Sequence, residues 1–327
     1  IKSLIKEEKR MKKYLEDLKQ ELIKRKLTSE EIDEIIQDHK EMISNAIDEG
    51  LSEEEIMKKF GQPSQVASEL ADFNDKEPAL QESTDEYQCF KTFEVLEDTF
   101  SAHVNLISED ITYQVGSDDK IKVFYKGKGK VDHYEISYEK NEFRLSAPKK
   151  LGFNFSFSKE NGIDFLVELP RKAILDVLKQ VTISSDSELK NIKANDLIIN
   201  TTSGDVTVLS CKIGKMKLHS VNGDAKFKDS SFDDVVISQV SGDVTMENSN
   251  IEKDYRGNTV SGDIELEDVT CVNFESSAVS GDVNGENFYP QRIIFKSVSG
   301  DLNIKNSEKK YIEIVKKSSL SGDISIS

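Results

Sequence analysis

Aspartate recurs at a nearly constant interval through the C-terminal half of the chain, and evenly spaced carboxylates could bind a cation such as calcium. The seven residues are Asp205, Asp224, Asp243, Asp263, Asp282, Asp301 and Asp323. Each directly follows the glycine of an SGD or NGD motif, and these glycines are Gly204, Gly223, Gly242, Gly262, Gly281, Gly300 and Gly322. Successive glycines are 19, 19, 20, 19, 19 and 22 residues apart. A fixed period near twenty residues is typical of a solenoid.

The SGD motif also has a structural interpretation, which is the one we favour. Serine, asparagine and aspartate side chains can bond nearby backbone N–H groups, and glycine permits the backbone angles of a sharp corner. Carboxylates stacked at the strand spacing of about 4.8 Å would repel each other by only about 1 kcal/mol in water. Known calcium-binding nonapeptide repeats are also richer in glycine. The sequence therefore predicts turn-forming aspartates, with calcium binding as the weaker alternative.

Alignment of the repeats on their glycine gives the expected core. Four positions are almost entirely apolar, and their alternation indicates β-strands. Two residues after the glycine lie Val206, Ala225, Val244, Ile264, Val283, Leu302 and Ile324, and four after it lie Val208, Phe227, Met246, Leu266, Gly285, Ile304 and Ile326. Two before it lie Thr202, Val221, Val240, Val260, Val279, Val298 and Leu320, and seven before it lie Leu197, Met216, Val235, Tyr255, Phe274, Ile293 and Val315. We expect an all-β parallel β-solenoid of about 19 to 20 residues per coil, with these ladders inside.

Other residues that could carry chemistry are scattered. Cys89, Cys211 and Cys271 form no CxxC pair, so we expect buried free thiols rather than disulfides or a zinc site. The four histidines are equally dispersed, and no nucleophile elbow, phosphate loop or metal cluster occurs in the sequence. The sequence predicts no catalytic residues, no metal and no cofactor.

A polysaccharide-active enzyme is a remote alternative, because some such enzymes are β-helices. Those enzymes build a cleft from long loops inserted between coils. The nearly constant spacing leaves no room for such a loop except around Glu308 to Lys310, so we expect no cleft. The chain also contains no tryptophan, a residue that glycan-binding surfaces use for stacking.

Composition limits the possible partners and location. A formal net charge of −17 disfavours nucleic acid, because phosphate backbones recruit Lys and Arg. No apolar run reaches the eighteen residues of a membrane helix, and no signal peptide is recognisable, so a cytoplasmic location is the default expectation. Cell-surface association is the alternative. Met11 resembles a natural start, which would make residues 1–10 an N-terminal extension.

A small helical domain is expected over residues 11–73. Apolar residues at Met11, Leu15, Leu18 and Leu22 line one helical face. A capping box places a second helix start near Ser29, and a third short helix carries Ile56, Met57 and Phe60 between Gly50 and Gly61. Pro63 suits the first turn of a fourth helix.

Two further segments separate the helices from the repeats. Residues 74–86, NDKEPALQESTDE, are acidic and polar, and predict a flexible linker. Residues 87–180 contain alternating runs such as KIKVFYKG and IDFLVELP, and predict β-rich opening coils and a cap for the repeats at 181–327.

The run LTSEEIDEIIQDHKEMISNAIDEGLSEEEIMKKFGQPSQVASELADF resembles the HAAS signalling domain, with Gly50, Gly61 and Pro63 at the expected places. The resemblance covers about sixty residues. It implies a protein partner bound through the helical domain, such as a PadR-like transcriptional regulator. The membrane helices that often follow this domain are absent from the sequence. A helical cap or oligomerisation segment without a signalling role is the alternative.

The β-rich stretch from about residue 90 to 327 resembles a family of bacterial β-solenoid domains named as adhesins, in which a VELP strand precedes GD-marked coils. Together the two resemblances imply a non-enzymatic signalling or regulatory scaffold of a Gram-positive bacterium, linked to envelope stress, whose solenoid serves for docking or assembly. A surface adhesin or glycan-binding module is the alternative. Because an alternating strand ends at Ser327 without a polar cap, we also expect a homodimer through this coil.

Overall fold

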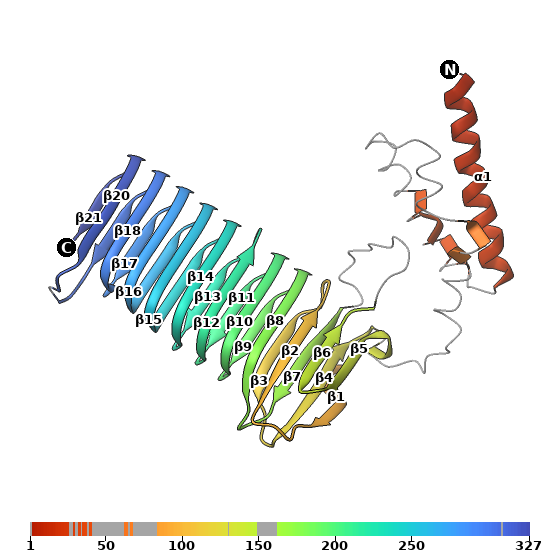
Figure 1. The fold of residues 1–327 in the computed structure, drawn as a ribbon. Helices are drawn as coiled ribbons and strands as arrows, with labels where there is room; N and C mark the ends of the chain where they lie inside the picture. The colour runs from red at the N-terminus through yellow and green to blue at the C-terminus, as the bar shows by residue number, and fades with distance from the viewer. Residues whose placement is uncertain are drawn as a thin grey trace. The chain divides into compact units, whose positions relative to one another are not determined.

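A computed structural model describes residues 2–25, 29, 32–33, 35–37, 39–40, 62–64, 66–67, 84–129, 131–148, 162–308 and 310–327. The chain divides into two compact units (Figure 1). The helical unit comprises Ile1–Gln81 with Lys149–Ser158, and the β-unit comprises Glu82–Pro148 with Lys159–Ser327.

The helical unit begins with helix α1, Lys2–Lys24. Steps of four residues bring Tyr14, Leu18 and Leu22 to one face, where all three are buried. Their partners in this small core are Ile32, Ile36 and Ala67. The described residues between 29 and 40 and between 63 and 67 are helical, in agreement with the helix starts predicted near Ser29 and Pro63.

Some sequence predictions fall on residues that the structure does not describe. These are the short helix around Ile56, the turns at Gly50 and Gly61, and residues 74–83 of the linker. The first strand, β1, begins at Thr84, so its first three residues belong to the segment 74–86 that composition assigned to the linker.

Mixed strand pairing closes the first end of the β-unit. β1 (Thr84–Glu94) and β7 (Ile163–Leu169) both pair antiparallel with β4 (Lys120–Gly127). β5 (Glu135–Glu139) and β6 (Glu142–Ser146) form an antiparallel pair that follows a short 3-10 helix, Val131–His133.

Two strands connect this cap to the repeats through parallel pairing. β2 (Thr99–Asn105) lies between β6 and β8, and β3 (Ile111–Val115) lies between β7 and β9. Parallel coil-to-coil pairing therefore starts before the glycine motif does.

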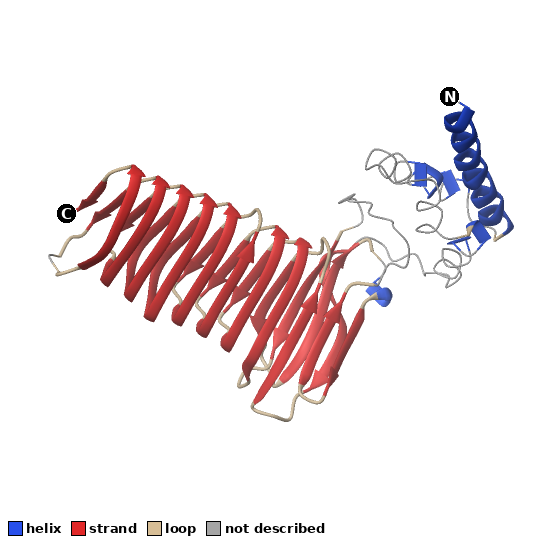
Figure 2. Ribbon diagram, turned by 45° about the horizontal axis from the view of Figure 1, so that its top comes forward, coloured by secondary structure: helices blue, strands red, loops and turns tan. Residues whose placement is uncertain are grey.

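From β8 onward the chain winds as a parallel solenoid of about eight turns (Figures 1 and 2). The longer strands are β8 (Ile174–Ser184), β10 (Lys193–Ser203), β12 (Lys212–Ser220), β14 (Ser231–Ser241), β18 (Tyr289–Ser299) and β20 (Glu313–Ser321). The shorter strands are β9 (Ser187–Lys190), β11 (Val206–Leu209), β13 (Ala225–Lys228), β17 (Val283–Glu286), β19 (Leu302–Lys305) and β21 (Ile324–Ile326). β15 (Val244–Ser261) and β16 (Ile264–Ser280) each run through both positions.

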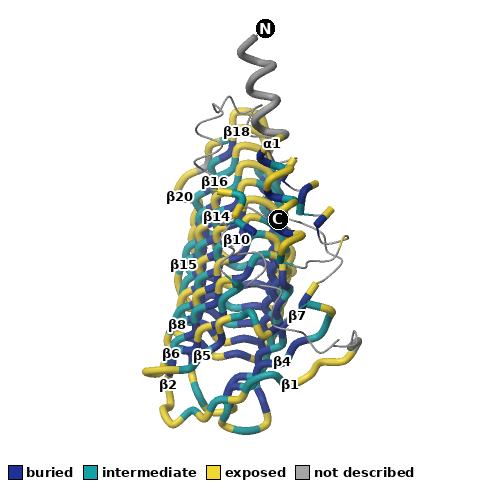
Figure 3. Tube along the Cα trace, turned by 90° about the vertical axis from the view of Figure 1, so that its right-hand side faces the viewer, coloured by how far each residue is buried: buried dark blue, intermediate teal, exposed yellow. Residues whose placement is uncertain are grey.

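The strand register confirms the predicted fold class. Residues one repeat apart are partners, as with Val206 and Ala225, or Leu197 and Met216. Three of the four predicted ladders are buried in most coils, and Figure 3 shows buried residues following the inside of the coils. Aromatic side chains fill the later coils, where the Tyr255 and Phe274 rings stack with their centroids 5.0 Å apart.

The fourth ladder corrects the core prediction. The residues two positions before the glycine lie outside, with Val221 43% exposed, Val279 50% exposed and Leu320 84% exposed. The preceding residue is the buried one at Ser220, Gln239 and Ser297, whereas Thr259 and Ala278 are half-buried. At this end of the strand the inward positions are therefore offset by one residue from the prediction. Val315 is also exposed, because the longer last repeat shifts the register between Ile293 and Ile294.

The cysteine prediction is correct at two of three positions. Cys211 and Cys271 are free and buried, whereas Cys89 is free and exposed. Cys89 lies on β1, next to an irregularity in the pairing of β1 with β4, where a side chain can face solvent.

Candidate functional site

The glycine corners allow consecutive coils to stack closely. A Cβ atom at any of the seven motif glycines would collide with the backbone carbonyl of the corner one coil earlier, such as the Gly223 oxygen below Gly242. Five of the glycines have positive φ, for example 119° at Gly242, whereas Gly300 and Gly322 do not. Close approach of the backbones is therefore the requirement that all seven share.

The motif aspartates form a continuous ladder of hydrogen bonds. The backbone N–H of Asp243 donates to Oδ1 of Asp224 at 2.8 Å, and the N–H of Asp263 donates to Oδ1 of Asp243 at the same distance. The pattern runs from Asp110 through Asp186 to Asp323, at 2.7 to 2.9 Å throughout. Each of these carboxylates except that of Asp323, the last in the series, therefore uses one oxygen to hold the next corner.

A second corner, six residues after the glycine, was missed in the sequence. Asn191, Ser210, Asp229, Asn248, Asp268 and Asn287 have φ between 45° and 58°. The residue that follows points inward, and Ser230 Oγ accepts the Cys211 N–H at 3.1 Å while donating to the Lys228 carbonyl. Asparagine or aspartate stands at five of these six positions, and this pattern in the sequence could have predicted the corner, since both residues tolerate a left-handed conformation.

The described residues show neither a metal site nor an obvious catalytic group. Among them, no three His, Cys, Asp or Glu side chains are grouped so that they could hold a metal ion. Burial raises the pKa of Cys211 to about 11 and that of Cys271 to about 12, so both are protonated and poor nucleophiles at neutral pH.

One apolar surface runs along the β-unit. We call Val221, Val240, Val260, Val279 and Val298 the valine stripe. Consecutive members belong to adjacent coils, so they lie about 4.8 Å apart. Single exposed apolar residues are common on protein surfaces and need no explanation. A continuous apolar row is less common and is typical of a contact surface. Three residues further along each coil, the aspartate ladder follows the stripe as an acidic border.

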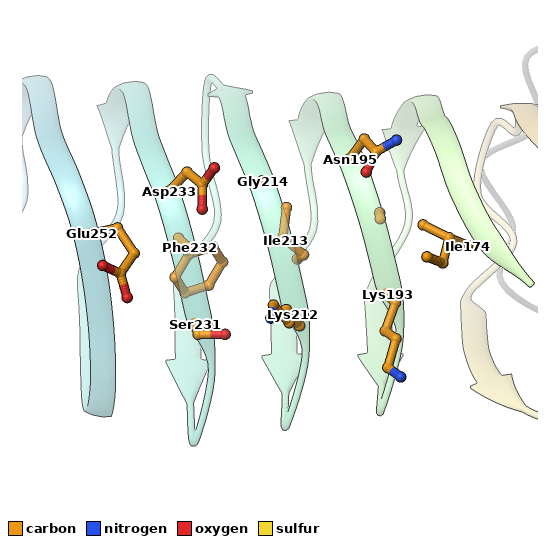
Figure 4. A pocket seen from close by; sticks show the side chains of 11 residues that line it. Ile174, Lys193, Asn195, Lys212, Ile213, Gly214, Ser231, Phe232, Asp233 and Glu252 are labelled. Carbon is orange, nitrogen blue, oxygen red and sulfur yellow. The ribbon is translucent and has the colours of Figure 1, made fainter. Parts of the chain in front are cut away.

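A groove of about 590 Å³ lies elsewhere on the β-unit and crosses β8, β10, β12, β14 and β15 (Figure 4). Figure 4 shows two rows of side chains, with Lys193, Lys212 and Ser231 in one row and Asn195, Gly214 and Asp233 in the other. Gly214 contributes no side chain to its row. We expected no cleft built from an inserted loop, and this groove lies instead on the strands of consecutive coils.

These features define a repeat protein of the β-solenoid class that carries a separate helical domain. Two family models match the chain: Toastrack DUF4097 over residues 135–287 and 257–327, and HAAS over residues 13–69. The chain belongs to the Toastrack DUF4097 family, and its N-terminus carries a HAAS domain. Neither family is catalytic, and HAAS domains pair with partner proteins. The HAAS domain fits a regulatory role.

Several solved structures resemble the chain. A "putative lipid binding protein" of Parabacteroides distasonis is 17% identical, with a TM-score of 0.47, over 74% of this chain and 98% of the other. A "putative adhesin" of Bacteroides fragilis is 16% identical, with a TM-score of 0.38, over 74% and 97%. A "putative adhesin" of Parabacteroides merdae is 15% identical, with a TM-score of 0.35, over 72% and 97%. No curated protein sequence matches the chain.

Proposed function

We propose that this protein is a regulatory scaffold that holds two protein partners. The helical domain contacts one partner, for which a PadR-like regulator is the candidate. The solenoid docks a second partner along the valine stripe. The exposed valine row is the observation that carries the proposal, because its members are roughly half exposed.

Charge indicates what kind of protein would fit the stripe. The aspartates that border it use one carboxylate oxygen in the corner hydrogen bonds, and the chain has a net charge of −17. A partner that places apolar side chains on the valines and lysine or arginine beside the aspartates would match both features. Complementary charge of this kind raises association rates and specificity.

The proposed setting is the response of a Gram-positive bacterium to envelope stress. This setting is what the sequence resemblance to the two domain families implies. Within the described part of the chain, no helix combines the length and apolar character that a membrane crossing requires.

The test is a pull-down from native cells with the full chain as bait. The variant Val240→Glu/Val260→Glu/Val279→Glu places charges on the stripe, and we expect it to lose at least tenfold of the docked partner. A matched control, Ser238→Glu/Asn258→Glu/Ser277→Glu, adds the same charge to outward positions of the same strands. We expect this control to retain the partner.

Two results would count against the proposal. One is equal recovery by wild type and the valine variant, and the other is equal loss in the valine and control variants. Fractionation of the cells before the pull-down tests the alternative of a surface adhesin, which would place the protein at the cell surface with wall glycan bound.

A further inference from the structure

A small cavity lies inside the β-unit beside the paired strands β14 and β15. Its volume is about 10 Å³, and its walls include Gln239, Tyr255 and Thr259 together with the corner glycines Gly242 and Gly262. A buried water molecule needs a cavity of about 10 to 15 Å³ and two to four polar partners. The space is therefore just large enough for one water.

Three side chains of the cavity wall carry buried polar atoms that have no hydrogen-bond partner in the described part of the chain. These atoms are the amide oxygen of Gln239, the hydroxyl of Tyr255 and the hydroxyl of Thr259. Tyr255 is only 1% exposed and Gln239 only 5% exposed. Buried polar groups in folded proteins are nearly always hydrogen-bonded to the protein or to ordered water. Three such groups around one cavity therefore indicate a shared partner inside it.

Packing holds the Tyr255 hydroxyl in the core. The Tyr255 ring stacks on Phe274, with the ring centroids 5.0 Å apart and an angle of 17° between the planes. Gly257 leaves room for the phenol, because a Cβ there would lie 2.9 Å from Cε1 of Tyr255 and 3.1 Å from its hydroxyl oxygen. The partners of Gly257 in the adjacent coils, Ile237 and Ser276, both carry side chains. Glycine at this one inward position therefore lets a phenol hydroxyl reach the interior.

Equivalent hydroxyls in the two preceding coils find their acceptors within the protein. The same register position in four consecutive coils is occupied by Thr201, Ser220, Gln239 and Thr259. Thr201 and Ser220 each donate to the carbonyl two residues further along the chain, at 2.9 and 3.1 Å. Thr259 makes no such bond. The amide nitrogen of Gln239 donates to a corner carbonyl at 2.9 Å, which leaves the amide oxygen for the cavity. The first two residues therefore need no further partner, whereas the last two do.

We propose that this cavity binds one water molecule that bridges Gln239, Tyr255 and Thr259. The amide oxygen of Gln239 can only accept a hydrogen bond, whereas each hydroxyl can donate or accept. A water that donates to Gln239 and accepts from Tyr255 satisfies both groups, and its other hydrogen is available to Thr259. All three groups are uncharged, which suits water rather than an ion. The site lies within the coils and does not depend on the proposed protein docking.

Magnetic relaxation dispersion of the solvent water counts the long-lived buried waters of the full chain and tests this proposal. We expect Tyr255→Phe/Thr259→Val, the cavity variant, to hold one such water fewer than wild type, because only Gln239 would remain to bond it. The matched control Thr201→Val/Ser220→Ala removes two hydroxyls that already bond protein carbonyls, and should keep the wild-type count. Circular dichroism melting verifies that each variant is folded.

Equal counts of long-lived waters in wild type and the cavity variant would overturn the proposal, as would an equal loss in the cavity variant and the control. A crystal structure of the wild-type chain gives a second test that does not depend on the folding of any variant. We expect density for one water within hydrogen-bond distance of Gln239, Tyr255 and Thr259. A cavity without this density, or a direct bond between the Tyr255 and Thr259 hydroxyls, would refute the water site.

Discussion

At the scale of single residues, the hydrogen bonds of the aspartates explain why the SGD motif recurs along the sequence. Each one before Asp323 accepts the backbone N–H of the next coil's aspartate with a carboxylate oxygen, as Asp243 does from Asp263 at 2.8 Å. The residue types predicted a turn with side-chain to backbone bonds. They could not predict that the bond joins one coil to the next, because that depends on how the coils stack.

The ladder makes a prediction for Asp243. Asp243→Ala removes the acceptor for the Asp263 N–H, and we expect the free energy of unfolding to fall by about 1 kcal/mol. Asp243→Asn keeps a carbonyl oxygen at this position and should cost clearly less. Urea unfolding followed by circular dichroism measures both variants.

The same experiment separates the turn from a calcium site. Calcium should leave the wild-type midpoint unchanged if the carboxylate serves the corner. A calcium-dependent rise in wild type that is absent from Asp243→Asn would contradict our interpretation.

At the scale of the coil, the glycine period predicted the solenoid, and the apolar positions predicted most of its core. The prediction was wrong at the residues two before the glycine, such as Val260. Apolar character alone cannot distinguish an inward strand residue from an exposed one beside a corner. A buried polar residue takes the inward position before several of these valines, for example Gln239 before Val240 and Ser297 before Val298.

The groove could not be predicted from the repeat for a related reason. It depends on Gly214 lacking a side chain at a position occupied by Asn195 and Asp233 in the adjacent coils. A single glycine outside the SGD motif carries no signal until its neighbours in the stack are known.

Close stacking at the corners predicts the effect of replacing two glycines. Gly242→Ala should destabilise the chain by about 2 kcal/mol, because the new Cβ meets the Gly223 carbonyl and φ is positive. We expect Gly300→Ala to cost about as much, since its Cβ would meet the Gly281 carbonyl although φ is not positive.

Urea midpoints compare these variants, with Ser241→Ala as a control beside the corner. A Gly300→Ala variant as stable as the Ser241→Ala control would contradict the close-approach explanation and leave φ as the determining factor.

At the scale of the whole molecule, two domains of different character share one chain. The helical unit has its own core around Leu18 and Leu22, and the β-unit has a continuous core along the coils. The sequence resemblance identified both domains. A homodimer through the last coil, around Leu320 and Ile326, remains a proposal that sedimentation at high concentration tests.

The most direct test of the docking scaffold is site-specific photo-cross-linking in the native cells. A photoreactive residue at position 260 of the full chain places the probe on the valine stripe, and one at position 253 of the same strand serves as the control. Our account predicts one protein cross-linked from position 260 and not from 253, and lost when Val240→Glu is added. No cross-link from position 260, or equal cross-links from both positions, would contradict it.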